Sequence, residues 1–210
     1  PFIGTGGHGH TFPGAVVPHG MIQPSPDTRI DGWDACSGYY YADSTINGFS
    51  HTHVSGTGCC DYGDVLLMPT VGKQQYRTTD PQSQRLAYAS SFSHKNEIAE
   101  PGYYSVFLDT YQVKAEISST KRGAIHRYTF PENTESGFII DLDYSLQRQT
   151  NSEMEIEVIS DTEICGHKKT TYWAFDQYIN FYAKFSKPFS YTLVTDSITM
   201  DNGKRLPVCK

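Results

Sequence analysis

Three stretches near the amino terminus gather the residues that could do chemistry. The first stretch, residues 4–14, reads Gly-Thr-Gly-Gly-His-Gly-His-Thr-Phe-Pro-Gly. Its glycines permit positive φ angles and let the backbone approach a ligand closely. A phosphate-binding loop is disfavoured, because no strand precedes the glycines, no helix follows, and no Lys-Ser or Lys-Thr pair completes the motif. His8 and His10 could ligate a metal, or they could hydrogen-bond to the backbone or to a sugar.

The second stretch, residues 29–38, places Trp33 between two aspartates, Asp31 and Asp34. An indole ring can pack on the C–H face of a pyranose while carboxylates accept hydrogen bonds from the sugar hydroxyls. The alternative is that Trp33 fills the core and that the aspartates cap a turn. The sequence leaves both interpretations open.

The third stretch, residues 48–64, contains His51 and His53. In an extended segment these two side chains would point to the same face, because strand side chains alternate. They could form a zinc site with neighbouring thiols or carboxylates, although the spacing matches no common zinc motif. The alternative is a buried polar network that braces the loops. The residues that could complete a zinc site are Cys59, Cys60, Asp61 and Asp64.

The spacing of the carboxylates nominates no catalytic pair. An inverting glycosidase needs two carboxyl groups roughly 6.5–9.5 Å apart across the scissile bond. The glycine-rich stretches offer only aspartates, and Glu97 and Glu100 stand beside Pro101, where we expect an exposed turn. Ser50 next to His51 could be a nucleophile, but it lacks the G-x-S-x-G elbow.

The chain changes character near residue 73. Residues 1–72 hold 13 of the 18 glycines, five of the eight histidines and a single cation, Arg29. Such a segment predicts long loops held on a scaffold, and loops on scaffolds usually carry function. We therefore interpret residues 1–72 as the substrate-facing part and residues 73–210 as the scaffold.

The scaffold shows the alternation of half-buried strands. Apolar and polar residues alternate strictly over residues 111–117. Short strands separated by turn residues predict an all-β, antiparallel β-sandwich with long glycine-rich amino-terminal loops, built as one domain over residues 1–210. The other expected strands are 104–109, 124–130, 137–143, 154–158, 179–185 and 190–195.

Composition and charge exclude some partners. The formal net charge is -6, and no basic stripe is present that could neutralise phosphates. We therefore expect no nucleic-acid partner and no anionic membrane partner. No apolar run reaches the roughly 20 residues that a membrane-spanning helix requires, and we expect no signal peptide within these residues. The five cysteines are an odd number and indicate no dense disulfide framework.

The motifs taken together resemble glycoside hydrolase family 92, a family of exo-acting α-mannosidases. The resemblance rests on the opening Pro-Phe-Ile-Gly-Thr-Gly-Gly-His-Gly-His-Thr-Phe-Pro-Gly-Ala, on Trp33-Asp34, and on Gly-Phe-Ser-His-Thr-His-Val-Ser-Gly-Thr-Gly at residues 48–58. Later landmarks at residues 101–106, 126–130 and 185–189 follow in the same order. The resemblance is strongest over the first 70 residues and extends to about residue 190.

The resemblance implies a supersandwich-like amino-terminal β-sandwich that packs against a carboxy-terminal (α/α)6 barrel of the same polypeptide, which this chain lacks. It implies Ca²⁺-dependent removal of terminal α-linked mannose from glycans such as N-glycans, with inversion, and with α-1,2 as the expected linkage. The barrel would supply both acid and base, so this chain would hold no catalytic residue and no metal ligand. A secreted or periplasmic location is implied as well.

The resemblance also implies which residues of this chain meet the sugar. His10 and Phe12 would line the pocket, Trp33 and Asp34 would lie near the mannose, and His51 and His53 would brace or touch the site. Two alternatives stay open: a free-standing carbohydrate-binding module that uses Trp33, and a zinc hydrolase built on the histidines and cysteines. The isolated half-site would bind mannose weakly, with a dissociation constant of about millimolar or worse.

Overall fold

The computed structural model describes residues 2–76, 83–148, 150–194, 197–201 and 204–208, and it describes side chains as far as residue 194. The chain divides into two compact units, Pro1–Arg148 and Gln149–Lys210. All strand pairs in both units are antiparallel. The treatment of residues 1–210 as one domain stays a prediction, so each unit is described by itself.

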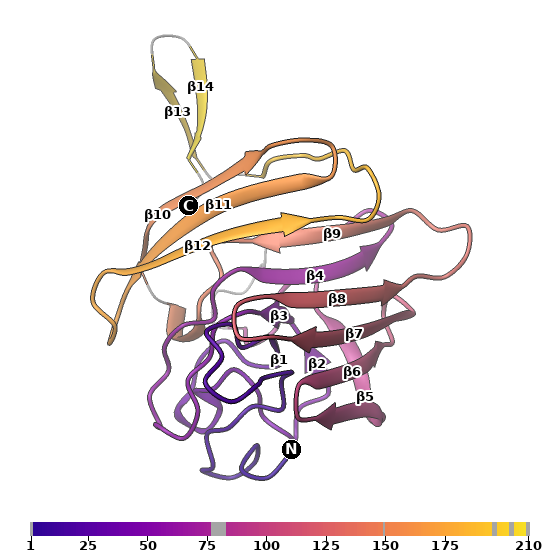
Figure 1. Ribbon diagram of the computed structural model, residues 1–210, viewed down its shortest axis with the longest axis vertical. Helices are drawn as coiled ribbons and strands as arrows, with labels where there is room; N and C mark the ends of the chain where they lie inside the picture. Colours follow the sequence, from indigo (N-terminus) through magenta and orange to yellow (C-terminus); the bar gives the residue numbers. More distant parts are fainter. Residues whose placement is uncertain (1, 77–82, 149, 195–196, 202–203, 209–210) are drawn as a thin grey trace. The chain divides into compact units, whose positions relative to one another are not determined.

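The first unit contains a four-stranded sheet with the strand order β1-β3-β4-β9 (Figure 1). Its members are β1 (Ser25–Asp27), β3 (Gly48–Ser50), β4 (Leu66–Val71) and β9 (Ser136–Asp141). The pairing of β4 with β9 runs from Leu66 opposite Asp141 to Val71 opposite Ser136. This sheet therefore joins the glycine-rich part of the chain to the scaffold.

A five-stranded sheet with the order β2-β5-β6-β7-β8 faces the first sheet. Strands β5 to β8 form a meander of sequence neighbours (Figure 1). Successive strands in such a meander need only short turns, such as the one at Pro101-Gly102. The members of this sheet are β2 (Thr45–Ile46), β5 (Ser90–Glu100), β6 (Tyr103–Leu108), β7 (Val113–Ser119) and β8 (Ala124–Thr129).

The core of the first unit lies between these two sheets. Phe49 of β3 and Tyr104 of β6 are fully buried, with 6.3 Å between their ring centroids. Leu66 and Met68 from β4 enter the same cluster as the inward residues of β6 and β7. The predicted antiparallel β-sandwich is therefore confirmed. The β6 and β7 residues in this cluster are Tyr104, Val106, Leu108, Val113, Ala115 and Ile117.

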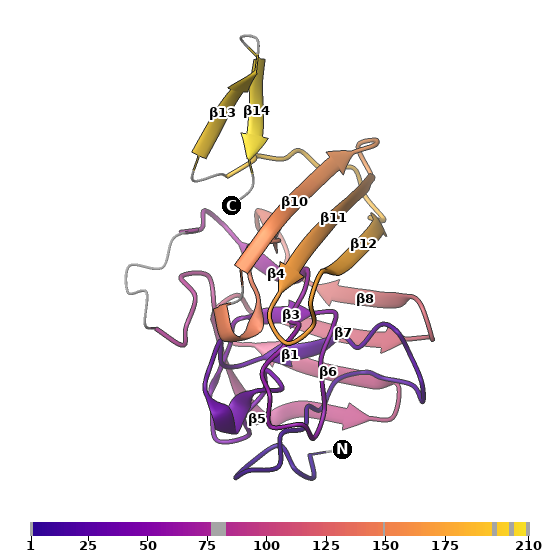
Figure 2. The ribbon, with the colours of Figure 1, turned by 90° about the vertical axis from the view of Figure 1, so that its left-hand side faces the viewer.

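The second unit has a three-stranded sheet and a two-stranded sheet (Figure 2). Strand β11 (Glu163–Thr171) is central, between β10 (Thr150–Val158) and β12 (Gln177–Lys184). Strand β13 (Ser197–Asp201) pairs with β14 (Lys204–Val208).

Loops dominate the first 72 residues, as predicted. Strands β1, β2 and β3 have only two or three residues each. A single 3-10 turn, η1 (Trp33–Ala35), interrupts the loops of this segment, and η2 (Leu146–Arg148) closes the unit. Figures 1 and 2 show the indigo and violet loops gathered around β1 and β3. The short strands hold three long loops close together.

Two predictions about the scaffold are wrong. Residues 190–194 form no strand, and Thr195 lies outside the described residues. Glu97 does not lie in an exposed turn, because it is buried inside β5. Its carboxylate accepts hydrogen bonds from the hydroxyls of Tyr39 and Tyr104, and Nδ1 of His94 lies 2.6 Å from Oε2. Glu97 is thus a satisfied structural carboxylate.

Candidate functional site

An exposed indole marks the candidate site. Trp33 opens η1 directly after Gly32, whose φ of 107° is a backbone conformation that suits glycine. Trp33 is 58% exposed, so the alternative in which it fills the core is wrong. Two histidine rings lie against the indole: His8 at 4.8 Å between centroids and His10 at 4.5 Å. The glycine-rich loop and η1 therefore meet at this tryptophan.

Asp34 joins the same cluster through His8. The His8 Nδ1 atom lies 2.5 Å from Oδ1 of Asp34, and both side chains are open to solvent. Asp34 stands in the first turn of η1, next to Trp33. The structure thus brings together three of the predicted residues, His10, Trp33 and Asp34, and adds His8 to them.

His10 is held by its backbone, while its ring keeps one polar atom without a partner. Its carbonyl oxygen accepts hydrogen bonds from Oγ of Ser37 at 2.5 Å and from the Gly56 amide at 2.6 Å. The residue is 7% exposed, and its Nε2 atom is buried with no hydrogen-bond partner among the residues described. A buried polar atom without a partner costs free energy unless a ligand or water satisfies it.

Gly58 closes over both rings. A Cβ atom there would lie 3.1 Å from Cε1 of His10 and 3.3 Å from Nε1 of Trp33. Its φ of 65° also lies in the left-handed region that glycine adopts readily. The loop after β3 therefore packs its bare backbone against the candidate site.

His53 forms the centre of a second, buried cluster. Its Nε2 atom lies 2.8 Å from Oδ1 of Asp27 and 3.1 Å from Oγ of Ser50, and its Nδ1 atom lies 2.7 Å from the Gln23 carbonyl oxygen. The predicted pocket residue Phe12 packs on this imidazole at 4.8 Å between centroids. Ser50 and Asp27 meet the same ring nitrogen, whereas a catalytic triad needs them at opposite nitrogens. The cluster braces the loops rather than activating Ser50.

His51 belongs to a third cluster, because the extended segment that would place it on the same face as His53 ends before it. Strand β3 ends at Ser50, and the alternation of side chains ends with it. The His51 Nδ1 atom lies 2.6 Å from the Val65 carbonyl oxygen, and its Nε2 atom lies 3.2 Å from Nε2 of His126. Burial lowers the pKa of His51, and burial together with His51 lowers the pKa of His126 to about 3.

Comparison with known proteins decides the family. The pattern of the glycosyl hydrolase family 92 N-terminal domain matches residues 1–206. The chain belongs to glycosyl hydrolase family 92. It is also 32% identical over 134 residues to an uncharacterised secreted glycosidase of Arthroderma benhamiae, and this match covers 62% of the present chain and 17% of that protein.

Solved structures of family 92 proteins superpose on this chain. The α-mannosidase BT3965 of Bacteroides thetaiotaomicron, solved in complex with mannoimidazole, is 37% identical with a TM-score of 0.84 over 98% of the present chain and 26% of its own. The inverting mannosidase BT2199 of the same organism is 30% identical, with a TM-score of 0.61 over 76% of this chain and 20% of its own. The family 92 domain described here thus spans about a quarter of the length of BT3965.

The family 92 domain forms no metal site within its described residues. No group of three or more His, Cys, Asp or Glu side chains in that part of the chain is arranged to hold a metal ion. The zinc site considered from the sequence therefore does not assemble from the described histidines and cysteines. Cys36, Cys59, Cys60 and Cys165 are free thiols, and burial raises the pKa of Cys60 to about 12.

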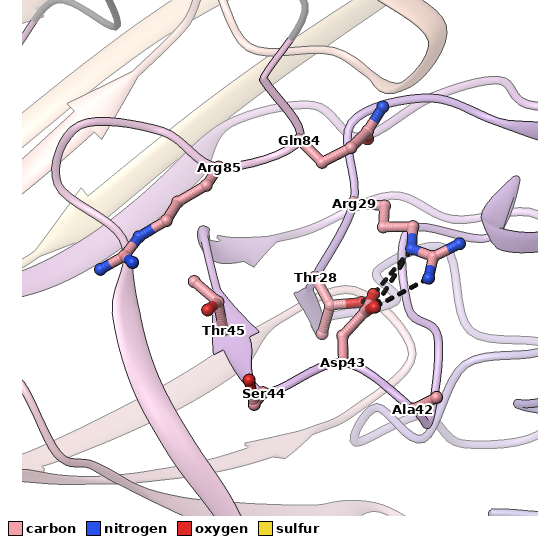
Figure 3. A pocket seen from close by; sticks show the side chains of 8 residues that line it. All are labelled: Thr28, Arg29, Ala42, Asp43, Ser44, Thr45, Gln84 and Arg85. Atoms are coloured by element: carbon pink, nitrogen blue, oxygen red, sulfur yellow. Dashed lines mark hydrogen bonds and ion pairs between the residues drawn. The ribbon is translucent and has the colours of Figure 1, made fainter.

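A polar recess of about 260 Å³ lies beside Arg29 and Asp43 (Figure 3). The Arg29 guanidinium donates two-pronged hydrogen bonds to the Asp43 carboxylate, and it lies 4.2 Å over the Tyr40 ring. Figure 3 shows Arg85 pointing away from this ion pair. None of the six predicted sugar-binding residues lines the recess. We therefore interpret it as structural and place the candidate site at Trp33.

Two structural contributors were missed at the sequence level, Asp27 and Gly58. Asp27 is fully buried in β1 and meets His53 across 26 positions of sequence. Gly58 acts by lacking a side chain. The sequence carries no signal for Asp27, because its burial, and with it the need for a partner, arises only in the folded chain. Among the residues described, no helix is long and apolar enough to cross a membrane.

Proposed function

We propose that this chain forms the sugar-positioning domain of an exo-acting α-mannosidase. The observation that carries the proposal is the pairing of an exposed indole, Trp33, with a buried and unpartnered imidazole nitrogen, His10 Nε2. A pyranose offers both complementary features, a C–H face for the indole and hydroxyl groups for the imidazole. BT3965 and BT2199 are mannosidases, which indicates mannose as the sugar.

Each residue of the cluster has a role in this proposal. Trp33 provides the platform, and His10 exchanges a hydrogen bond with one hydroxyl of the mannose. Asp34 keeps one carboxylate oxygen beyond the one that contacts His8, and this oxygen can accept from a second hydroxyl. The buried clusters around His53 and His51 hold the loops in place, and rigid placement of a substrate can contribute several kcal/mol to catalysis.

The general acid and the general base belong, in this proposal, to a carboxy-terminal barrel domain outside the present chain. An inverting reaction, α-1,2 specificity, action on N-glycans and Ca²⁺ dependence are parts of the same proposal for the whole enzyme. Among the described residues no group of three or more His, Cys, Asp or Glu side chains is arranged to hold a metal ion, so the proposal gives Ca²⁺ no ligand in this chain. The secreted relative in Arthroderma benhamiae supports an exported location, secreted or periplasmic.

The test is the release of mannose from α-1,2-mannobiose by the protein extended through its natural carboxy-terminal continuation. We expect Trp33→Ala to lower kcat/KM by at least about tenfold, which corresponds to about 1.4 kcal/mol of lost transition-state binding. The matched control is Trp173→Ala, because Trp173 is 70% exposed and lies in the second unit. Equal activity of Trp33→Ala and the parent enzyme would reject the proposal.

The same assay separates the proposal from the free-standing binding module. We expect the 210-residue chain alone to release no mannose, and we expect a chelator to stop the extended enzyme. Turnover by the isolated chain would show that the acid and base lie among its own aspartates. Tight mannose binding by the isolated chain, with no gain in activity from the extension, would favour the module.

A further inference from the structure

One face of the three-stranded sheet in the second unit carries exposed polar and aromatic side chains. In the middle of this face Glu155 of β10 lies opposite His167 of β11, and His167 lies opposite Asn180 of β12. In the next row Glu157 pairs with Cys165, which pairs with Tyr182. Since side chains alternate along a strand, these residues share one face. The apolar residues of the outer strands occupy the opposite face; they are Met154, Ile156, Val158, Ile179, Phe181 and Ala183.

This face is hollowed at its centre. A recess of about 320 Å³ lies at the paired rows; it is lined by the polar residues Glu155, Glu157, His167 and Asn180 together with Cys165, Gly166 and Phe181. That volume falls at the lower end of the roughly 300–1,000 Å³ range of small-ligand sites. The recess therefore has room for one monosaccharide unit and offers it carboxylate, imidazole and amide groups.

Two tyrosines flank the recess on β12. Tyr178 and Tyr182 are each 58% exposed, and four residues along a strand separate them by about 13 Å. The Nζ atom of Lys169 lies 4.9 Å from the Tyr178 ring centre, and the Tyr182 side chain hydrogen-bonds with Glu163. These contacts orient both rings and leave much of their surface open. Exposed tyrosines held in this way are suited to stacking on sugar rings.

The two carboxylates in the recess have open acceptor capacity. The closest approach of Glu155 to a basic group is 3.8 Å, to Nδ1 of His167, and Glu157 accepts only a long contact of 3.8 Å from Sγ of Cys165, as far as the described side chains show. Both separations exceed the length of a strong hydrogen bond. Sugar hydroxyl groups are donors that could form shorter hydrogen bonds to the same carboxylate oxygens.

The charges on this face select for a neutral ligand. Two lysines form ion pairs with carboxylates. The Nζ atom of Lys169 lies 3.0 Å from Oδ1 of Asp176, and the Nζ atom of Lys184 lies 2.9 Å from Oε1 of Glu163. Among the described side chains Glu157 has no basic partner and Glu155 has only His167, 3.8 Å away, so these two carboxylates would repel an anionic polymer.

We propose that this face of the β10-β11-β12 sheet is a second glycan-binding site, one that takes a neutral oligosaccharide or polysaccharide. Tyr178 and Tyr182 stack on sugar rings, and the groups in the recess bind hydroxyls of the unit between them. Such a site would hold the enzyme on a polymeric substrate while Trp33 positions the terminal residue. The proposal rests on the proposed function only in the choice of a mannose polymer as the probe.

Affinity electrophoresis of the 210-residue chain in gels with and without soluble α-mannan tests the proposal. We expect the mannan to retard the parent chain and Trp33→Ala alike. We expect the double variant Tyr178→Ala/Tyr182→Ala to lose retardation, with a dissociation constant at least about tenfold higher. The control is Tyr191→Ala, since Tyr191 is 67% exposed in the same unit and lies outside β12.

A second variant distinguishes a loss of mannan binding from a loss of folding. Glu155→Gln/Glu157→Gln keeps side-chain size and removes the charged acceptors, so it should bind mannan several-fold more weakly with an unchanged unfolding curve. Retardation that disappears in Trp33→Ala and persists in the tyrosine double variant would overturn this inference while supporting the proposed function. The absence of retardation for every protein would overturn it as well. A tyrosine effect on retardation, together with normal mannobiose release by Trp33→Ala, would leave this inference standing and reject the proposed function.

Discussion

The imidazole of His10 stands edge-on to the indole of Trp33, with 4.5 Å between their ring centroids and 77° between their planes. Three loops that are far apart in sequence meet at this contact: residues 4–14, η1, and the loop after β3. The geometry of the candidate site therefore depends on how closely the backbone of Gly58 approaches the two rings.

Substitution of Gly58 by alanine should disturb the site more than it disturbs the fold. The new Cβ would press on His10 and Trp33, so we expect kcat/KM of the extended enzyme to fall by about tenfold, equivalent to about 1.4 kcal/mol. Gly56→Ala is the matched control, because Gly56 has a φ of 77° and no atom within 4 Å of the added Cβ. Equal kcat/KM values for the two variants would contradict the role of this contact.

Gly38 has a structural constraint of a different kind. A Cβ there would clash with Oδ1 of Asp27 and would lie 3.3 Å from Nε2 of His53, and the φ of Gly38 is 84°. Gly38→Ala should lower the free energy of unfolding by about 3 kcal/mol, because left-handed strain adds to overpacking. Gly72→Ala, with a φ of 72° and open space around it, should cost only about 1 kcal/mol. Urea unfolding of both variants measures the difference, and similar midpoints would refute it.

The hydrogen bond from Tyr104 to Glu97 should stabilise the fold more than the hydrogen bond from Tyr103 to Glu116. Tyr104→Phe removes a 2.7 Å hydrogen bond to a buried carboxylate and should destabilise the protein by about 1–3 kcal/mol. Tyr103→Phe removes a 2.9 Å bond to Glu116, and we expect a smaller loss, because Glu116 keeps a two-pronged pair with the Arg127 guanidinium whereas Glu97 keeps only Tyr39 and His94. Thermal unfolding compares the pair, and the reverse order would show that Glu97 is not the more dependent group.

The pair of His51 and His126 predicts acid sensitivity. Both pKa values are lowered in the folded state, so unfolded histidines take up protons below about pH 6.5 while the folded pair stays neutral. The contribution of this neutral histidine pair to the free energy of unfolding is complete above that pH and is lost as the pH falls towards 3. His126→Gln should lower the slope of unfolding free energy between pH 5 and 6.5, by up to about 1.4 kcal/mol per pH unit. Unchanged slopes in chemical unfolding at several pH values would contradict this.

The fold was predictable where alternation was strict and the turns were short. Strand β7 and much of β10 followed the pattern of residues 111–117 and 154–158 closely. Strand β5 was missed because its register shifts between Phe92 and Glu97, which breaks the period of two. Residues 190–194 alternate in the same way but pair with no strand.

The candidate site was predictable as a set of loops but not as a set of contacts. Glycine and histidine content marked the loops, and the resemblance marked Trp33 and His10. The partition of His10, His53 and His51 into three clusters depends on where β3 ends and on contacts that cross many residues. Local sequence carries no signal for such contacts, because they arise only when the two sheets pack.

The pairing of β4 with β9 has a consequence for how the protein is made. Strand β4 ends at Val71, and its partner begins at Ser136, so about 65 residues must be synthesised before the pairing can form. At roughly 5–20 residues per second, this takes several seconds on the ribosome. Meanwhile the meander β5 to β8 can fold from local pairs, which form fastest. We therefore expect the sugar-positioning loops, although translated first, to acquire their native arrangement after the scaffold behind them.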